Sequence, residues 1–218
     1  MERFYTLAFA AGIGCFAVAF ILAFIFPWMT IEEYHGAKYR TLEELAETPS
    51  ASFIELSEKF PEAFAREFPA GVNSDTYGEA LRLGRDLYIG QACWHCHSQY
   101  VRVVSNEMQR FGPASTAQEY QNALNQPHLW GTRRVGPDLT REFGLRTNDW
   151  HIAHLISPKD VVPYSVMPAY AYYFEKDGTP KKDGFGLVTY LQWIGSEYIR
   201  QAEEKAADAE NAEEGTDG

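Results

Sequence analysis

The sequence predicts a mainly α-helical protein in which a single membrane-spanning helix precedes a small helical domain. Three observations support this fold class. Residues 4–26 are uncharged and almost wholly apolar. Further along the chain, apolar side chains recur at three- and four-residue spacing, as they do along one face of a helix. None of the 218 residues belongs to a stretch with the alternating apolar and polar pattern of a strand, and no internal repeat occurs.

Composition and patterning divide the chain into four parts: an anchor over 4–27, a helical connector over 28–76, a helical domain over 77–198 and an acidic, disordered tail over 199–218. The formal net charge is −11, from 30 acidic and 19 basic residues. Because nucleic-acid binders carry a basic surface, no nucleic acid is expected as a partner. The three cysteines imply no disulfide framework.

The anchor is long enough to cross a membrane, because a helix of about 20 apolar residues spans a bilayer. Pro27 and Trp28 end the apolar run, and a Trp at this place fits the aromatic belt of the membrane interface. A cleaved signal peptide is the alternative, but the apolar core is too long and no Ala-x-Ala-like site follows it. We therefore expect an uncleaved, single-pass anchor.

The connector is predicted to contain short helices. Residues 41–44 (Thr-Leu-Glu-Glu) and 52–55 (Ser-Phe-Ile-Glu) both fit the capping-box pattern. Pro61 starts a second helix or kinks the first. Either the following domain or a partner subunit covers the apolar helical face, whose members are Phe53, Leu56, Phe60, Phe64 and Phe68.

The central motif of the following domain is Cys93-Trp94-His95-Cys96-His97, the c-type haem attachment signature. Each thiol adds across one vinyl group of a single haem, so both sulfurs must lie on one short turn. The imidazole of His97 then ligates the iron from the proximal side. A zinc knuckle would need a second cysteine pair, and a redox dithiol would need a βαβ context. One covalently bound haem c is therefore the predicted cofactor.

An electron-transfer haem needs a second axial ligand. The downstream candidates are His128, His151, His154 and Met167. Met167 lies in a loop between Pro163 and Pro168, and a rigid loop holds a thioether still while thioether ligation raises the potential. Met167 is the predicted ligand, and His151 and His154 are expected to be polar pocket or interface residues.

Two further features are expected near the haem. The segment 136–139 (Gly-Pro-Asp-Leu) is predicted to pack on the proximal side, where a backbone carbonyl, such as that of Pro137, accepts the second imidazole proton of His97. Arg102, Arg133 and Arg134 either pair with haem propionates or are exposed surface residues.

The order of helix, haem motif, loops, methionine loop and terminal helix resembles the class I cytochrome c fold. A more specific resemblance rests on five blocks: Gly84-Arg85-Asp86-Leu87-Tyr88-Ile89 before the motif, Trp130-Gly131, Asn148-Asp149-Trp150-His151, Pro158-Lys159-Asp160-Val161-Val162-Pro163 and Met167-Pro168-Ala169-Tyr170. Together they resemble the monohaem, membrane-anchored subunit (subunit II) of the cbb3-type cytochrome c oxidases, the C-family haem-copper oxidases. The chain departs from the family where Val103 follows Arg102, a place commonly taken by proline.

The resemblance implies a non-catalytic subunit. It would relay electrons from a dihaem cytochrome subunit or a soluble cytochrome c donor to the polytopic haem-copper catalytic subunit, which reduces dioxygen to water. Cys93 and Cys96 would form the thioethers, with His97 and Met167 as axial ligands. Covalent attachment outside the cytoplasmic membrane implies a bacterial inner-membrane protein with a periplasmic haem domain. The alternatives are the electron-entry subunit of a nitric oxide reductase and a free-standing, membrane-anchored carrier.

Overall fold

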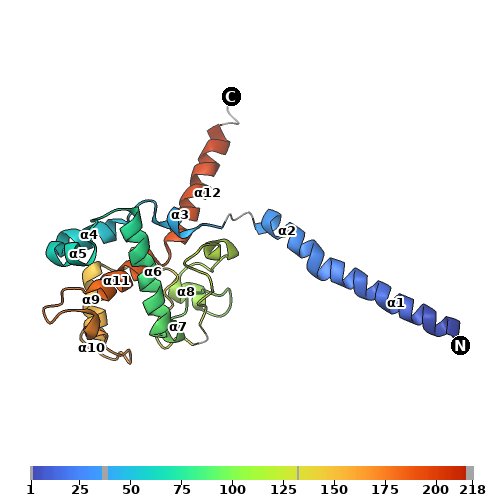
Figure 1. Cartoon of the computed structure of the whole chain (residues 1–218), viewed down its shortest axis with the longest axis horizontal. Helices are drawn as coiled ribbons and strands as arrows, with labels where there is room; N and C mark the ends of the chain where they lie inside the picture. Colours follow the sequence, from blue (N-terminus) through green and yellow to red (C-terminus); the bar gives the residue numbers. More distant parts are fainter. Residues whose placement is uncertain (1, 36–38, 132, 215–218) are drawn as a thin grey trace. The chain divides into compact units, whose positions relative to one another are not determined.

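The computed structural model describes the backbone of residues 2–35, 39–131 and 133–214 (Figure 1). The chain forms two compact units, residues 1–38 and residues 39–218. The described residues are mainly helical and contain no extended strand, only two isolated β-bridges, Arg40–Asn122 and Phe174–Pro180. The mainly α fold class is therefore confirmed.

The first unit is helical over its described length, through α1 (Glu2–Phe20), the π-helical η1 (Ile21–Ile25) and α2 (Phe26–His35). In the π-helical turn, the amide of Phe26 donates to the carbonyl of Ile21, directly before Pro27, which has no amide hydrogen to give. From Glu2 to Thr30 the helix is long and apolar enough to cross a membrane. This finding is consistent with a single-pass membrane anchor.

The second unit opens with three short helices, α3 (Leu42–Ala46), α4 (Ala51–Lys59) and α5 (Pro61–Glu67). The capping box predicted at Thr41 and Glu44 is present. The one predicted at Ser52 is wrong, because the extended N-cap backbone falls on Ser50, whose hydroxyl accepts a hydrogen bond from the amide of Phe53. Pro61 occupies the first turn of α5 and therefore starts a second helix.

The aromatic face of the connector packs inside this unit. Phe53 is fully buried, and its ring centroid lies 5.2 Å from those of Phe64 and Tyr77. Phe64 in turn meets Phe185 edge to face at 5.5 Å. Tyr77 belongs to α6 (Ser74–Gly90) and Phe185 to α11 (Lys182–Trp193). Of the two alternatives, the following domain, not a partner subunit, covers these rings.

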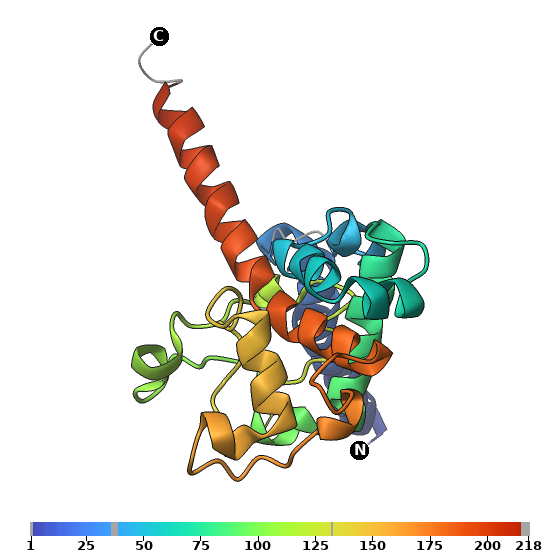
Figure 2. The same ribbon diagram turned by 90° about the vertical axis from the view of Figure 1, so that its left-hand side faces the viewer.

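Helices α6 and α11 form the centre of the domain and cross in direct contact (Figures 1 and 2). Gly84 makes this approach possible, because a Cβ atom there would lie 2.0 Å from the carbonyl oxygen of Gly186. Asn73 is the N-cap of α6 and exchanges hydrogen bonds with Thr76.

The remaining elements are short. Thr147 caps α9 through a hydrogen bond from the amide of Trp150. Between α8 and α9 the described residues form one 3-10 turn, η2. The short elements are α7 (Cys93–Cys96), α8 (Glu107–Phe111), η2 (Ala117–Tyr120), α9 (Asn148–Ile156), α10 (Pro158–Val161) and η3 (Ala171–Tyr173).

The acidic tail differs from the prediction of disorder, because residues 196–214 form the helix α12 (Ser196–Glu214; Figure 2). The composition lacks apolar side chains for a core, but Ala, Glu, Lys and Arg are strong helix formers. Arg200 also pairs with Glu197 and Glu204 at helical spacing. At the base of the helix, the nearly buried Glu197 forms an ion pair with Arg40.

Candidate haem site

The haem motif forms one compact turn at the end of α6. Ala92 takes a left-handed conformation, with φ of 56°, and so redirects the chain into α7. The amide of His97 then donates to the carbonyl of Cys93 at 2.8 Å, which closes the turn. Cys93 is half-buried, Cys96 is exposed, and both thiols are free. One helical turn thus presents two thiols and an imidazole to the same neighbourhood.

The imidazole of His97 is oriented through one of its two nitrogens. Nδ1 lies 3.0 Å from the carbonyl oxygen of Pro137, so the expected hydrogen bond is present. With Nδ1 as the donor, Nε2 keeps its lone pair for a metal. Burial lowers the pKa of His97, although the Pro137 carbonyl and Asp138 act in the opposite direction. The ring is therefore neutral at pH 7, which is the form that ligates iron.

Gly136 allows the backbone to pass under this ring. A Cβ atom at this position would lie 2.3 Å from Cε1 of His97 and 2.7 Å from both ring nitrogens. The amide of Gly136 also donates to the carbonyl of Cys96 at 3.0 Å. The glycine therefore holds the segment 136–139 against the haem motif.

Asp138 secures this segment, and sequence reasoning did not single it out. Its carboxylate, almost fully buried, accepts hydrogen bonds from the hydroxyl of Ser98 at 2.6 Å and the amide of Tyr100 at 3.0 Å. It also accepts from the amide of Thr140 at 2.8 Å. The spacing of Asp138 and Thr140 is that of an Asx turn, a local signal that could have pointed to this residue. The pairing with Ser98 spans 40 residues of sequence and has no such signal.

Tyr170, three residues after Met167, connects the methionine loop to the haem motif. The amide of Tyr170 donates to the carbonyl of Leu155 at 2.7 Å. Burial raises the pKa of the Cys93 thiol to about 11, and a hydrogen bond with the Tyr170 side chain opposes that shift. Met167 is half-buried and packs against the hydrophobic core, as Cys93 also does. The structure thus brings the predicted distal ligand and the motif to one core.

The three candidate histidines differ in their neighbours. His151 is buried, its Nε2 lies 3.8 Å from the Glu142 carboxylate, and burial lowers the pKa of the imidazole to about 4. His154 stacks on the ring of Trp150, with centroids 4.6 Å apart, and its pKa is lowered by burial and by the nearby imidazole of His97. His128 is exposed and stacks on Trp130.

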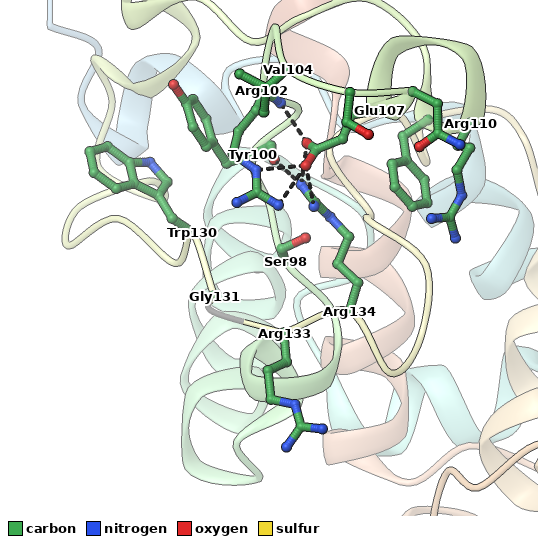
Figure 3. Close-up of a pocket in the computed structure, with 13 residues that line it drawn as sticks. Ser98, Tyr100, Arg102, Val104, Glu107, Arg110, Trp130, Gly131, Arg133 and Arg134 are labelled. Carbon is green, nitrogen blue, oxygen red and sulfur yellow. Dashed lines mark hydrogen bonds and ion pairs between the residues drawn. The ribbon is translucent and has the colours of Figure 1, made fainter.

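Arg102 and Arg134 converge on Glu107 (Figure 3). Arg134 places two guanidinium nitrogens 2.8 Å from the carboxylate and donates to the carbonyl of Tyr100 at 2.6 Å. The Glu107 side chain is only 8% exposed. Burial alone would raise its pKa, but hydrogen bonds from Arg102 and Arg134 outweigh that effect and lower it to about 2. A role for either arginine on haem propionates stays a prediction.

Comparison with known families decides between the alternatives. Residues 51–217 match the family described as cytochrome c oxidase, mono-heme subunit/FixO. The chain belongs to this family. It is the monohaem subunit of a cbb3-type oxidase, and its function is electron transfer to the catalytic subunit. No curated protein matches the chain.

The family implies a haem and a catalytic subunit as partner. The structure offers residues that fit a haem at 93–97. Two free thiols and an imidazole share one turn, and the Nδ1 contact with Pro137 leaves Nε2 available. The match also decides in favour of the oxidase over the nitric oxide reductase and the free-standing carrier.

Proposed function

We propose that the subunit carries one covalently bound haem c, joined to Cys93 and Cys96 through thioethers, with His97 and Met167 as axial ligands. The observation that carries this proposal is the single turn α7, which presents both thiols and the oriented imidazole together. When bound, the haem supplies one-electron redox chemistry. The surrounding protein determines how firmly the ligands are held.

Each ligand has its own support. The carbonyl of Pro137 takes the Nδ1 proton of His97 and fixes the orientation of the ring. Two hydrogen bonds hold the Met167 loop. The amide of Met167 donates to the Ser165 hydroxyl at 3.2 Å, and the amide of Tyr170 donates to the carbonyl of Leu155. Ligands held in this way move little when the oxidation state changes, which favours fast electron transfer.

We propose that the haem domain lies on the periplasmic side of the bacterial inner membrane and receives electrons from a dihaem or soluble cytochrome c. Support for this side comes from the chemistry, because c-type attachment takes place outside the cytoplasmic membrane. The apolar helix Glu2–Thr30 supplies the attachment to the membrane.

The ligand set is tested with Met167→Ala and a matched control, Met108→Ala. Met108 is half-exposed, and its loss should leave the haem unchanged. Met167→Ala should retain covalent haem, lower the reduction potential and let the reduced protein bind carbon monoxide. Carbon monoxide binding by the wild-type protein at neutral pH, or no difference between the two variants, would contradict Met167 as ligand.

The attachment is tested with the double change Cys93→Ala and Cys96→Ala. We expect the haem to become extractable with acidified acetone, because no thioether is left to retain it. Haem that stays attached to the double variant would refute the proposal.

A further inference from the structure

A cavity of about 410 Å³ lies next to the residues that follow the haem motif in the chain. Ser98, which follows His97, is part of its lining (Figure 3). The lining is basic although the whole chain has a net charge of −11. We call this surface the arginine pocket, after four of its residues: Arg102, Arg110, Arg133 and Arg134.

The four arginines form an inner and an outer pair. The inner pair, Arg102 and Arg134, binds Glu107, which lies between them. Arg110 and Arg133 are exposed, and neither forms an ion pair with any residue whose placement the structure describes. The four guanidinium groups are matched by two carboxylates, those of Glu107 and of Asp138, which lies 3.5 Å from Nε of Arg134, so the cluster has a net charge of +2. The available positive charge is therefore on the outer pair.

Exposed apolar side chains accompany this charge. Val104 and Trp130 line the pocket and are 53% and 48% exposed, and Val103 beside them is 78% exposed. The Trp130 ring stands 5.3 Å from that of Tyr100, which also lines the pocket. A small inorganic anion needs only the charges. Trp, Tyr and Arg together are the residue types that dominate protein–protein contacts.

We propose that the arginine pocket is the docking site for an acidic protein that donates electrons to the haem domain. The inference rests on the proposed function, because it requires the haem at residues 93–97. A partner seated on the half-buried Tyr100 and the exposed Trp130 lies beside the turn 93–97, because the buried Ser98 joins that turn to the pocket. Carboxylates of the partner meet Arg110 and Arg133, while the Trp130 surface supplies an apolar contact.

The remaining surface of the subunit gives the pocket its selectivity. An acidic partner is repelled by a chain of charge −11 and attracted only where the local charge is positive. Such complementarity orients the encounter and raises the association rate by about 10- to 1,000-fold, an effect that salt removes. Removal of the local positive charge is therefore expected to slow docking more than an equal change of charge elsewhere on the chain, and salt should weaken this difference.

The test uses the full chain, with its haem, in detergent. The probe is flavodoxin hydroquinone, an acidic electron-transfer protein, and haem reduction is followed by stopped-flow absorbance at low and high salt. The pocket variant is Arg110→Glu with Arg133→Glu. The control, Lys176→Glu with Lys205→Glu, makes the same change in total charge at two exposed residues outside the pocket lining. Hexaammineruthenium(II), a small cationic reductant, reports whether the haem itself is intact.

We expect the pocket variant to be reduced by flavodoxin at least about tenfold more slowly than the wild type at low salt and to lose most of its salt dependence. The control should slow by less than about threefold, since its charges do not contact the partner. Equal slowing of the two variants would overturn the docking site. The docking site would also be overturned if phosphate slowed the reduction of the wild type by flavodoxin more than sodium chloride does at equal ionic strength. That result would indicate a small-anion site.

The two proposals fail in different ways. Suppose that hexaammineruthenium(II) reduces the haem, but flavodoxin reduces the pocket variant and the control variant at the same rate. This result would refute the docking site and leave the proposed function intact. A chain that carries no covalent haem would refute the proposed function and this inference with it.

Discussion

The glycine beneath the proximal histidine offers a direct test of how the protein controls its haem. In Gly136→Ala the new methyl group would lie 2.3 Å from Cε1 of His97. Ordinary carbon–carbon contacts begin near about 3.5 Å, so the ring and the backbone must separate by roughly 1 Å. The bond from Nδ1 to the Pro137 carbonyl, now 3.0 Å, would lengthen to about 4 Å and be lost.

The size of the effect follows from the value of that bond. A hydrogen bond of this kind contributes about 0.5–1.5 kcal/mol. For a one-electron couple, about 1.4 kcal/mol corresponds to 59 mV, so the shift is at most about 20–60 mV, because only the part of the bond energy that differs between the ferric and ferrous states moves the potential. The carbonyl makes the imidazole a stronger base, which favours the ferric state. Its loss should therefore raise the reduction potential.

Spectroelectrochemical titration of the haem measures this shift. The control is Gly90→Ala, three residues before the motif, where an added Cβ atom meets nothing within 4 Å. The control should keep the wild-type potential. A Gly136→Ala protein whose potential is unchanged or lower would refute the reasoning, because the contact between residue 136 and the ring would then not set the orientation of His97.

Three further variants test the fold. Phe53→Ala empties a fully buried site between three aromatic rings and should cost about 3–5 kcal/mol, a fall in Tm of about 6–20 °C by calorimetry, whereas the half-exposed Ile54→Ala should change stability by less than about 1 kcal/mol. Gly84→Ala places a Cβ atom 2.0 Å from the Gly186 carbonyl and should destabilise the domain more than Gly90→Ala in urea titrations. Glu107→Gln should lower the free energy of unfolding by about 2–3 kcal/mol near pH 7. This is less than the loss expected when a fully buried ion pair is broken, because Arg102 is half-exposed. The pKa of Glu107 is lowered in the folded state, so the stabilisation that its carboxylate provides is complete above about pH 4.5 and is lost as the pH falls toward about 2. The difference in free energy of unfolding between the wild type and Glu107→Gln should therefore shrink over this pH range. A difference that stays constant would contradict the ion-pair network.

Most features that depend on neighbouring residues were predicted, although the capping box at Ser52 was wrong. The apolar run before Pro27, the capping box at Thr41 and the helix start at Pro61 all depend on a few consecutive side chains. The haem motif belongs to the same class, because its chemistry requires the five residues to be adjacent.

Most pairings between distant residues were missed, although the contact of His97 with the Pro137 carbonyl, 40 residues away, was expected from the chemistry of the haem motif. Glu107 and Arg134 are 27 residues apart, and Ser98 and Asp138 are 40 apart. Neither periodicity nor spacing indicates such pairs, because the loops that join them have no regular geometry. The helix α12 was missed for another reason. The segment lacks the apolar side chains that a core needs, and this lack predicts disorder. Helix formation, however, depends on the helix propensity of its residues.

The contacts of Arg40 have a mechanical consequence for a protein tethered to a membrane. A pull transmitted along the chain from the anchor reaches the second unit at its first residues. There the backbone of Arg40 is bonded to Gln121 at 2.9 Å and to Ala123 at 3.0 Å, while its side chain binds the Glu44 carbonyl and Glu197. The load is thus divided among three separate segments, and the turn that contains the haem motif is not one of them. Thermal motion of the anchor should therefore disturb this junction before it disturbs the motif.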